Sequence, residues 1–223
     1  MGLQEAQQRR LQNRSEARRV ILDSVEALLA EGGYRNFSMR KLVERCGYAA
    51  PTIYHYFGDK TGLLRELVDA RFRVLVGELE RVSLGRDPVE NARVLGRAFV
   101  DFGLRHSTHY GLLYLSHLTS LSPEGRAPDS EVGEQSEAAE EARRILEAPM
   151  LEIDALGRLR GIDLETARQA IWALCHGVIS LQTSRADLEW SPDLFEQAFD
   201  AMLCGLVEPD RATGARARKE KAR

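Results

Sequence analysis

The stretch SMRKLVERCGYAAPTIYHYFGDKTGLL, residues 38–64, decides the fold of this 223-residue chain. Ser38 is a type of residue that caps helices and Gly47 is one that ends them, so a short helix is predicted between them. Pro51 suits the first turn of a second short helix, which the pair Gly58–Asp59 ends. Short helices joined by a tight glycine turn are typical of a helix-turn-helix.

The segments on both sides of this stretch are also predicted to be helical. Apolar residues recur every three or four positions, and no segment alternates apolar and polar residues as a strand does. Upstream, we expect a helix from about Ser15 to the glycine pair Gly32–Gly33. Downstream, the predicted helices cover residues 60–84, 89–105, 109–118, 131–147 with a continuation past a kink at Pro149 to 160, a segment that Asp163 opens, and one that starts at Trp190. The fold class predicted is all-α, with a loop at residues 120–130.

Charge is distributed unevenly along the chain. The total is −3, but residues 1–71 hold 12 basic and 9 acidic residues, residues 72–210 hold 13 and 24, and residues 211–223 hold 6 and 1. A basic N-terminal part can meet a polyanion, whereas the acidic part that follows should avoid one. We therefore assign the two parts to different functions. The basic tail is interpreted as a solvated end of the chain, and the alternative is an arm that grasps phosphate.

Composition narrows the class of protein. With 43% hydrophobic and 29% charged residues, the chain is expected to fold into a soluble globular protein with a substantial core. Runs of eighteen apolar residues are absent, and the N-terminus resembles no secretory signal. Three widely spaced cysteines argue against a disulfide framework. We expect a cytoplasmic protein.

The third helix carries side chains suited to DNA. The residues predicted to face inward are Met39, Leu42, Val43, Cys46 and Ile53. Thr52, Tyr54, His55 and Tyr56 then remain exposed, which offers hydrogen-bonding groups to the major groove. Lys60 follows at a helix N-terminus, where its ammonium and free backbone N–H groups can hold a phosphate. The alternative is that these aromatic residues belong to the core of a plain helical bundle.

These residues closely resemble the tetracycline-repressor (TetR) family over about residues 14–68. The resemblance is carried by the pairs and runs Ile21-Leu22-Asp23, Gly33-Tyr34, Ser38-Met39-Arg40, Thr52-Ile53-Tyr54-His55-Tyr56-Phe57, Lys60 and Leu63-Leu64. Further on, Trp172 with His176-Gly177 resembles the W…HG signature of one subgroup of the C-terminal domains of that family. The resemblance implies a homodimeric repressor that binds a palindromic operator and is released by a small-molecule inducer.

The family's DNA contacts transfer to this chain position by position. They fall on Arg40, Ala50, Pro51, Thr52, Tyr54, His55, Tyr56 and Lys60. From the residues alone we add Arg14 and Arg18, which lie one helical turn apart and can clamp a phosphate, although a solvated helix start explains them almost as well. Ala49 stands where the family usually has a capping Ser or Thr, and this departure removes about 1 kcal/mol of helix stabilisation.

A ligand pocket is predicted between the C-terminal helices, because aromatic residues and histidines gather there in a chain with few aromatics. The candidates are Phe99, Phe102, His106, Tyr110, Leu113, Tyr114, His117, Trp172 and His176. The alternative for each of them is that it is an ordinary core residue and contacts no ligand. The scarcity of charge among them favours an apolar or aromatic inducer. His106 and His109 are three apart, but nothing is spaced to complete a metal site, so we predict neither metal nor cofactor.

Dimerisation is assigned to the last two helices. Small residues that allow close approach and bulky residues that fill the contact make up the predicted interface: Ala167, Ala170, Ala173, Gly177, Phe195, Phe199, Met202 and Leu206. Two such helices from each subunit suit a four-helix bundle. Gly177 has an alternative role, namely to allow close packing of helices within the subunit.

The predicted organisation is therefore an N-terminal three-helix, helix-turn-helix DNA-binding domain followed by a C-terminal helical ligand-binding and dimerisation domain. The boundaries are a disordered basic arm at 1–14, the DNA-binding domain at 15–60, the second domain at 61–208 and a disordered basic tail at 209–223. We expect no enzyme, because no catalytic signature or nucleophile–base spacing is present. The alternative is a helical enzyme or small-molecule carrier that uses the cavity lined by histidines and aromatic residues.

Overall fold

The computed structural model describes residues 2–115 and 136–209 of the chain. Within these ranges the regular structure is helical, apart from one isolated antiparallel bridge between Leu159 and Val207. The predicted all-α class is therefore confirmed. None of the helices in the described ranges is long and apolar enough to span a bilayer.

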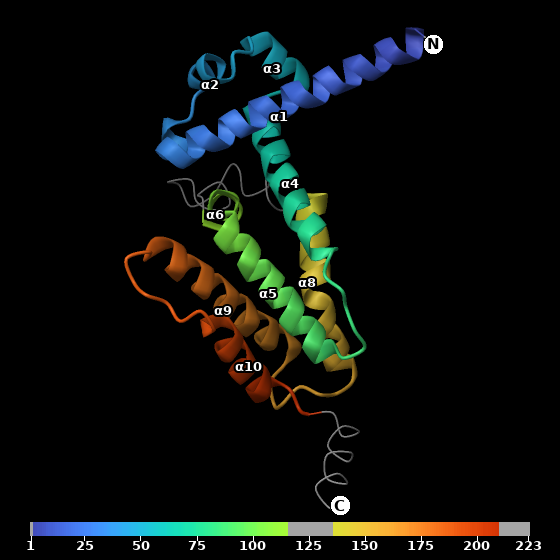
Figure 1. Ribbon diagram of the computed structural model, residues 1–223, viewed down its shortest axis with the longest axis vertical. Coiled ribbons are helices and arrows are strands. Elements are labelled where there is room, and N and C mark those ends of the chain that lie inside the picture. Colours follow the sequence, from blue (N-terminus) through green and yellow to red (C-terminus); the bar gives the residue numbers. More distant parts are fainter. Residues whose placement is uncertain (1, 116–135, 210–223) are drawn as a thin grey trace, which may run out of the picture. The chain divides into compact units, whose positions relative to one another are not determined.

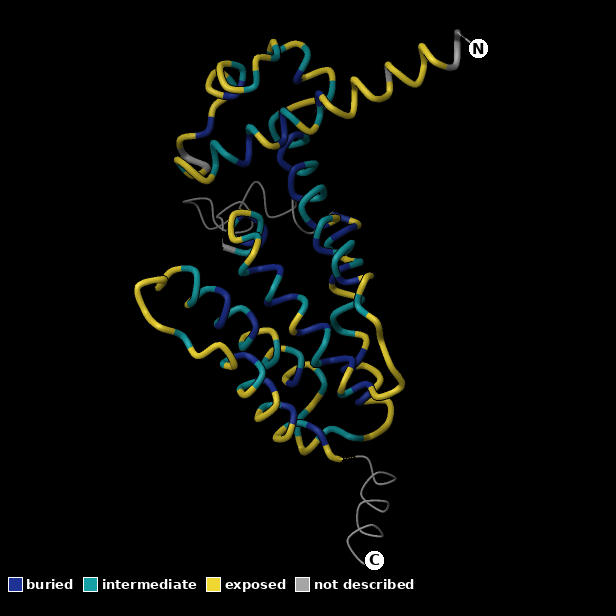
Figure 2. The backbone as a smooth tube through the Cα atoms, in the orientation of Figure 1, coloured by how far each residue is buried: buried dark blue, intermediate teal, exposed yellow. Residues whose placement is uncertain are grey.

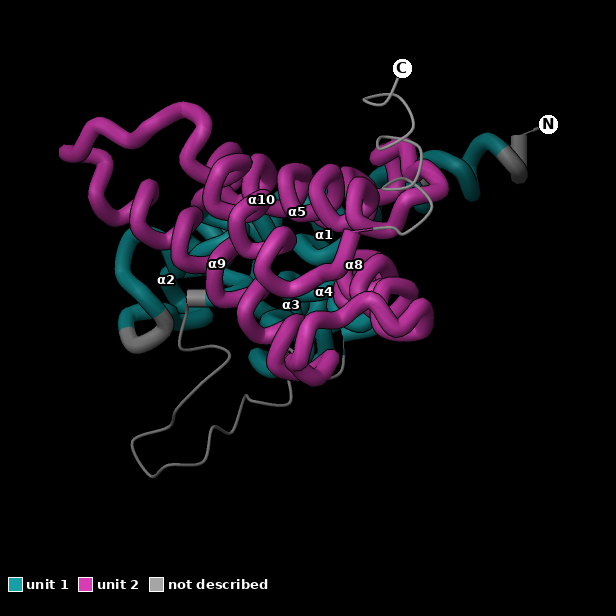
Figure 3. The backbone as a smooth tube through the Cα atoms, turned by 90° about the horizontal axis from the view of Figure 1, so that it is seen from below, with its two compact units in different colours: residues 1–74, 108–140 teal, residues 75–107, 141–223 magenta. Residues whose placement is uncertain are grey.

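The chain forms two compact units, which are coloured separately in Figure 3. Unit 1 consists of the described parts of residues 1–74 and 108–140, and unit 2 consists of those of 75–107 and 141–223. The domain boundary predicted after Lys60 was drawn between two functions and does not coincide with the division into these units. It stays a prediction.

Unit 1 is built around the first helix. Its elements are α1 (Gly2–Asn36), α2 (Met39–Cys46), α3 (Ala50–Phe57), the first part of α4 (Lys60–Leu79), α6 (Ser107–Tyr110) from Thr108 onward, and the π-helix η1 (Gly111–Leu115). Figure 1 shows α2 and α3 along one side of α1. The core side chains of this unit that are fully buried include Ile21, Val25, Leu42, Leu63, Leu64 and Leu67.

Helix α1 is longer than predicted. It begins at Gly2, so residues 2–14 are helical and not the disordered arm that we expected. The physical reason is intrinsic propensity, since this segment is rich in Gln, Glu, Ala, Leu and Arg. Residues 5–9 and 11–16 are exposed, as the start of the tube in Figure 2 shows, and among the residues whose burial is described Ala17 is the first that is buried. At the other end, Gly33 adopts a φ of 65°, which breaks the helix where the glycine pair predicted its end.

The helix-turn-helix forms as predicted. The Ser38 hydroxyl caps α2 by accepting from the backbone N–H of Lys41 at 3.4 Å, and Gly47 ends the helix with a φ of 73° in the left-handed region. Helix α3 starts after Ala49, which provides no side-chain cap, and carries Pro51 in its first turn. Both the cap and the missing cap were predictable from the sequence.

Unit 2 is a bundle of α5 (Pro88–Arg105), α9 (Leu164–Ser184) and α10 (Leu194–Leu206), which pack against one another, with most of α8 (Glu137–Ala155). Two glycines of α5 allow this close packing. A Cβ atom on Gly96 would lie 2.9 Å from the ring of Phe199, and one on Gly103 would lie 2.6 Å from Ile179. By contrast, a Cβ on Gly177 would meet nothing within 4 Å. Its predicted alternative role in packing helices within the chain is therefore wrong.

Several helix boundaries differ from the prediction: α8 ends at Ala155 and not near residue 160, and α10 begins at Leu194 and not at Trp190. Helix α4 ends at Leu79 and not near residue 84, because the chain turns into a loop that Asn91 holds: its side-chain amide bonds both the N–H and the carbonyl of Gly85 at 2.7 and 3.1 Å. Helix α8 continues through Pro149, which is buried, so packing of this face outweighs the lost backbone hydrogen bond. The predicted loop at 120–130, His117 and the tail from residue 210 lie outside the described residues.

Candidate nucleic-acid interface

Helix α3 divides its side chains between the core and solvent. Ile53 and Phe57 are only 1% and 7% exposed, whereas Tyr54 is 44% exposed and His55 is also exposed. Thr52 is half-buried. The helix is therefore anchored by its apolar residues and presents hydroxyl, imidazole and phenol groups outward. A plain core role is excluded for Tyr54 but holds for Phe57.

Arg18 of α1 braces α3 from behind. Its guanidinium donates to the carbonyl oxygen of Tyr56 at 3.0 Å, lies 4.9 Å from the ring centroid of Phe57 and forms an ion pair with Glu66 of α4. Arg18 is therefore engaged within the chain, and its predicted phosphate contact stays a prediction. Arg14, one turn earlier, is exposed and lies 5.9 Å from the ring centroid of Tyr56. Arg14 remains a predicted phosphate ligand beside α3.

The N-terminus of α4 is capped by a residue that the sequence analysis did not select. The Asp59 carboxylate accepts from the backbone N–H of Gly62 at 2.7 Å, so this group is not available to a phosphate. A Cβ at Gly62 would lie 2.2 Å from the carbonyl oxygen of Phe57, which requires glycine there. The signal for the cap was an Asp three residues before Gly62, next to the predicted break. The Lys60 ammonium lies 5.3 Å from the ring centroid of Phe37.

The other predicted DNA contacts lie at the start of α3 and on α2. Ala50 and Pro51 form the first turn of α3, and Pro51 is exposed. The Arg40 side chain is 85% exposed and lies 3.8 Å from the carboxylate of Glu44 on its own helix. The assignment of Arg40, Ala50 and Pro51 to DNA contacts stays a prediction.

The predicted ligand residues divide between the two units. Unit 2 contains Phe99, Phe102, His106, Trp172 and His176. The ring of His176 contacts those of Phe99 and Trp172 in tilted arrangements, with centroid distances of 5.3 and 4.4 Å, and burial lowers the pKa of His176 to about 4. Trp172 is 62% exposed, which argues for a surface role instead of a place deep in a pocket.

The remaining described candidates belong to unit 1. Tyr110, Leu113 and Tyr114 lie in α6 and η1, and Tyr110 and Leu113 are buried. The Tyr114 ring contacts those of Tyr110 and Phe72, at centroid distances of 5.3 and 5.8 Å, and burial raises the pKa of its phenol. These residues therefore take part in packing α6 and η1 onto α4.

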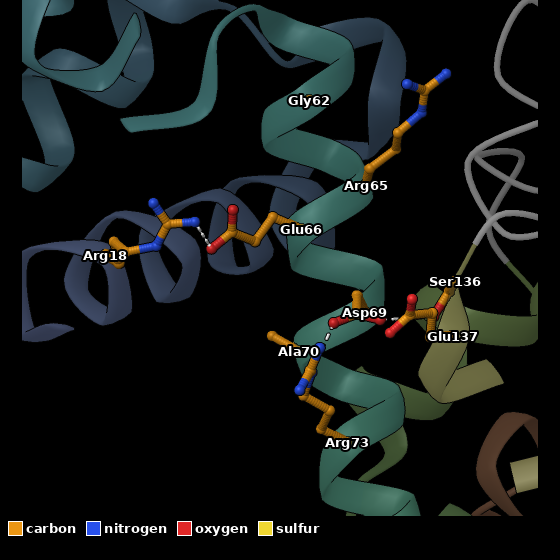
Figure 4. Close-up of a pocket in the computed structure, with 9 residues that line it drawn as sticks. All are labelled: Arg18, Gly62, Arg65, Glu66, Asp69, Ala70, Arg73, Ser136 and Glu137. Carbon is orange, nitrogen blue, oxygen red and sulfur yellow. Dashed lines mark hydrogen bonds and ion pairs between the residues drawn. The ribbon is translucent and has the colours of Figure 1, made fainter. Parts of the chain in front are cut away.

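A charged groove of about 680 Å³ runs along α4 in unit 1 (Figure 4). Its lining includes three arginines and three carboxylates, namely Arg18, Arg65, Arg73, Glu66, Asp69 and Glu137. Asp69 accepts from Arg73 at 2.6 Å and from the hydroxyl of Ser136 at 3.0 Å. Burial raises the pKa of Asp69, but these hydrogen bonds outweigh it and the net pKa lies below its usual value. The groove is thus largely neutralised by its own ion pairs, and it does not have the apolar lining typical of a ligand pocket.

The predicted dimer residues split into buried and accessible sets. Ala167, Phe195 and Phe199 are 0%, 5% and 2% exposed in the single chain, so they fill the core of unit 2 and are removed from the predicted interface. Phe199 packs on Gly96 of α5, a contact that helical spacing alone does not reveal. Those that remain accessible are Ala170, Ala173, Gly177, Met202 and Leu206.

Neither metal nor thiol chemistry has support in the described ranges. No group of three or more His, Cys, Asp or Glu side chains there is arranged to hold a metal ion. Burial raises the pKa of the Cys175 thiol to about 12, so the thiolate is strongly disfavoured.

Comparison with known proteins supports one family over most of the chain. Residues 21–67 match the model for bacterial regulatory proteins of the tetR family, and residues 92–206 match the model for a tetracyclin repressor-like C-terminal domain. The second match covers more than half of the chain. The chain therefore belongs to the tetR family of bacterial regulatory proteins.

Individual relatives are more distant. The HTH-type transcriptional repressor KstR of Rhodococcus jostii is 35% identical over 86 residues, which is 36% of this chain and 37% of that protein. KstR of Mycobacterium tuberculosis is 33% identical over 69 residues, 31% of each chain. The chain thus spans about a third of the length of the curated relatives it matches.

Solved structures extend the likeness of the fold. A tetR family regulator from Shewanella sp. PV-4 has a TM-score of 0.69 at 17% identity, covering 86% of this chain and 99% of its own. The regulator FadR of Bacillus subtilis, solved in complex with stearoyl-CoA, has a TM-score of 0.68 at 19% identity, covering 83% and 97%. At these identities the likeness concerns the fold alone.

Proposed function

We propose that this protein is a ligand-responsive transcriptional repressor that binds a palindromic DNA operator as a homodimer in the cytoplasm. A small apolar or aromatic inducer releases it. The proposal does not include an enzymatic activity.

The surface of α3 is the observation that carries the DNA-binding part. Tyr54 and His55 are exposed to solvent, while Ile53 and Phe57 are buried and anchor the helix in the core. Such a helix fits the width of the major groove. We assign contacts with the DNA phosphate backbone to Thr52, Tyr54, Tyr56 and Lys60. Arg14 and Arg40 would add contacts on either side of these residues. His55 is the candidate for reading a base edge.

The dimer is supported by an apolar face on α9 that is accessible in the single chain. Ala170, Ala173, Gly177 and Leu181 follow one another at intervals of three or four residues, and Leu181 is 51% exposed. Trp172 of the same helix is also accessible, with 62% of its surface exposed, but helical spacing places it away from this stripe. A second copy of the same face would cover these side chains by two-fold symmetry. We therefore add Leu181 to the proposed interface.

The chemical class of the inducer is proposed from the buried aromatic residues of unit 2. Phe99 and Phe102 are buried, and neither carries a polar group that would select a sugar or a phosphate. The stearoyl-CoA bound to FadR of Bacillus subtilis suggests that long-chain acyl thioesters belong in the first screen, beside aromatic compounds. A compound of the correct class should raise the melting temperature of the protein, because it binds the folded state.

The test is selection of genomic DNA fragments by the purified full chain. We expect a small set of fragments that share an inverted repeat, because the two subunits would place two recognition helices about one DNA turn apart. Tyr54→Ala and Lys60→Ala should abolish retention of these fragments. Each substitution removes a proposed contact with the DNA phosphate backbone. The fold should persist, because Tyr54 is exposed and Lys60 lies at the end of a helix.

Arg144→Ala is the matched control for loss of a positive charge. Arg144 lies on α8, is exposed, and pairs with Glu141 on its own helix at 2.6 Å. This variant should retain the fragments as the wild type does. Full retention by Tyr54→Ala would contradict the assignment of α3 as the recognition helix, and absence of any retained fragment would contradict the function itself.

A further inference from the structure

A buried carboxylate joins three helices of unit 1. Glu26 of α1 is only 8% exposed, and each of its oxygens faces a nitrogen from another helix. Arg71 of α4 donates from Nε to Oε2 at 2.8 Å, and Nε2 of His109 in α6 lies 3.5 Å from Oε1. The sequence gives no sign of this cluster, because Glu26 and Arg71 are 45 residues apart.

The cluster continues along α1. Arg71 also donates from Nη2 to Asp23 at 2.6 Å, and Asp23 in turn accepts from Arg19 at 3.2 Å. The Arg71 side chain is 11% exposed and that of His109 is 23% exposed. Glu26, Arg71 and His109 are therefore withdrawn from solvent, whereas Arg19 lies at the surface.

Because Glu26 is buried, its ionised carboxylate depends on the partners that face it. An ionised side chain out of water is strongly unfavourable unless a partner compensates it, so Glu26 needs the groups that face it. Those groups come from α4 and α6, and α1 can shift relative to these helices only by separating the pairs. The cluster thus fixes the positions of α1, α4 and α6 within unit 1.

The cluster connects a helix that contacts the proposed recognition helix with a helix that follows a candidate ligand residue. On one side, α1 braces the recognition helix, since Arg18 donates to the carbonyl of Tyr56 in α3. On the other side, α6 follows α5 directly in the chain, and His106 at the end of α5 is a candidate ligand residue. A displacement of α6 would therefore be transmitted to α1 through the pair of His109 and Glu26.

We propose that His109 is a positioning residue for DNA binding, which acts through Glu26 to hold α1 and α3 in the arrangement that fits DNA. This inference rests on the proposed function. Removal of the pair lets α1 sample more positions, so that binding must restore order and becomes weaker.

The experiment measures the affinity of full-length variants for a DNA fragment that the wild type retains. His109→Leu removes the ring nitrogens, and Glu26→Gln keeps an oxygen acceptor for Arg71 while it removes the charge. We expect each variant to bind about tenfold more weakly, a typical size for coupling between sites. Size and helical content should be those of the wild type.

The double variant separates positioning from general destabilisation. If both residues act through one contact, the combined change should weaken binding no more than the weaker-binding single variant does. Amide hydrogen exchange should also accelerate in residues 108–115 of Glu26→Gln, which reports release of α6 without any DNA. If His109→Leu does not fold, Glu26→Gln still provides both measurements.

Arg73→Gln is the matched control on α4. Arg73 lies two residues from Arg71, but its side chain is 68% exposed and its ion pair is with Asp69 on its own helix. It should bind DNA within about twofold of the wild type, as expected for an exposed pair. Wild-type affinity in Glu26→Gln, or additive losses in the double variant, would overturn the inference and leave the repressor assignment intact. A wild type that retains no DNA would overturn both.

Discussion

At the scale of single residues, His176 illustrates how packing changes chemistry. Its ring contacts those of Phe99 and Trp172, and burial lowers its pKa from an ordinary 6.5 to about 4. The folded chain thus keeps the imidazole neutral at a pH where the unfolded chain protonates it. Because the unfolded state then binds more protons, the free energy of unfolding should fall as pH drops from 6.5 toward 4.

The substitution His176→Gln isolates this effect. The variant lacks the titrating ring, so its stability should decrease less than that of the wild type between about pH 7 and pH 5. Urea denaturation at both pH values provides the measurement. Equal losses in the two proteins would show that the ring is protonated in the folded chain as readily as in the unfolded one.

At the scale of helices, the start of α3 offers a gain in stability. Ala49 provides no side-chain acceptor for the first turn, although Thr52 and Ile53 direct their backbone N–H groups toward the carbonyl of Ala49. Ala49→Ser should supply the missing acceptor and raise the free energy of unfolding by about 1 kcal/mol. The same change at Ala201, which is exposed in the middle of α10, should bring no gain. If the two variants have equal stability, the cap does not form.

The helices themselves were largely predictable from the sequence, and their contacts were not. Ser38, Gly47 and Gly33 mark helix ends through local chemistry, which spacing and residue type express directly. The burial of Phe195 and Phe199 depends on Gly96 of α5, about a hundred residues earlier, and such distant complementarity leaves no periodic signal. The same holds for the candidate site. The exposed residues of α3 were predicted from the sequence. The contact of Arg18 with Tyr56 was not, because the two residues are 38 positions apart, and the cap that Asp59 forms on Gly62 was not predicted either.

At the scale of the whole molecule, the charge of −3 averages a basic N-terminal part and an acidic remainder. This separation suits a protein whose N-terminal part meets DNA and whose other part is repelled by it. The proposed dimer is what would pair two such N-terminal parts on one operator.

Gly177→Leu tests the dimer. Within the chain the new side chain meets open space, since a Cβ at Gly177 has nothing within 4 Å, so the fold should be kept. A second copy approaching this face would clash with it, and we expect light scattering to show a monomer. Gly77→Leu is the control, because Gly77 is also helical and equally open but lies on α4. A wild type that is monomeric at micromolar concentration, or a dimeric Gly177→Leu, would contradict the proposed interface.

The most direct test of the central claim is an equilibrium titration of a selected DNA duplex with the wild-type chain at increasing salt. We predict binding by two chains per duplex, with a slope of log K against log salt of several units, about −0.9 for each phosphate contact. A duplex with a scrambled inverted repeat should bind far more weakly. Equal affinity for both duplexes, or no binding at low salt, would contradict the account of this protein as a repressor.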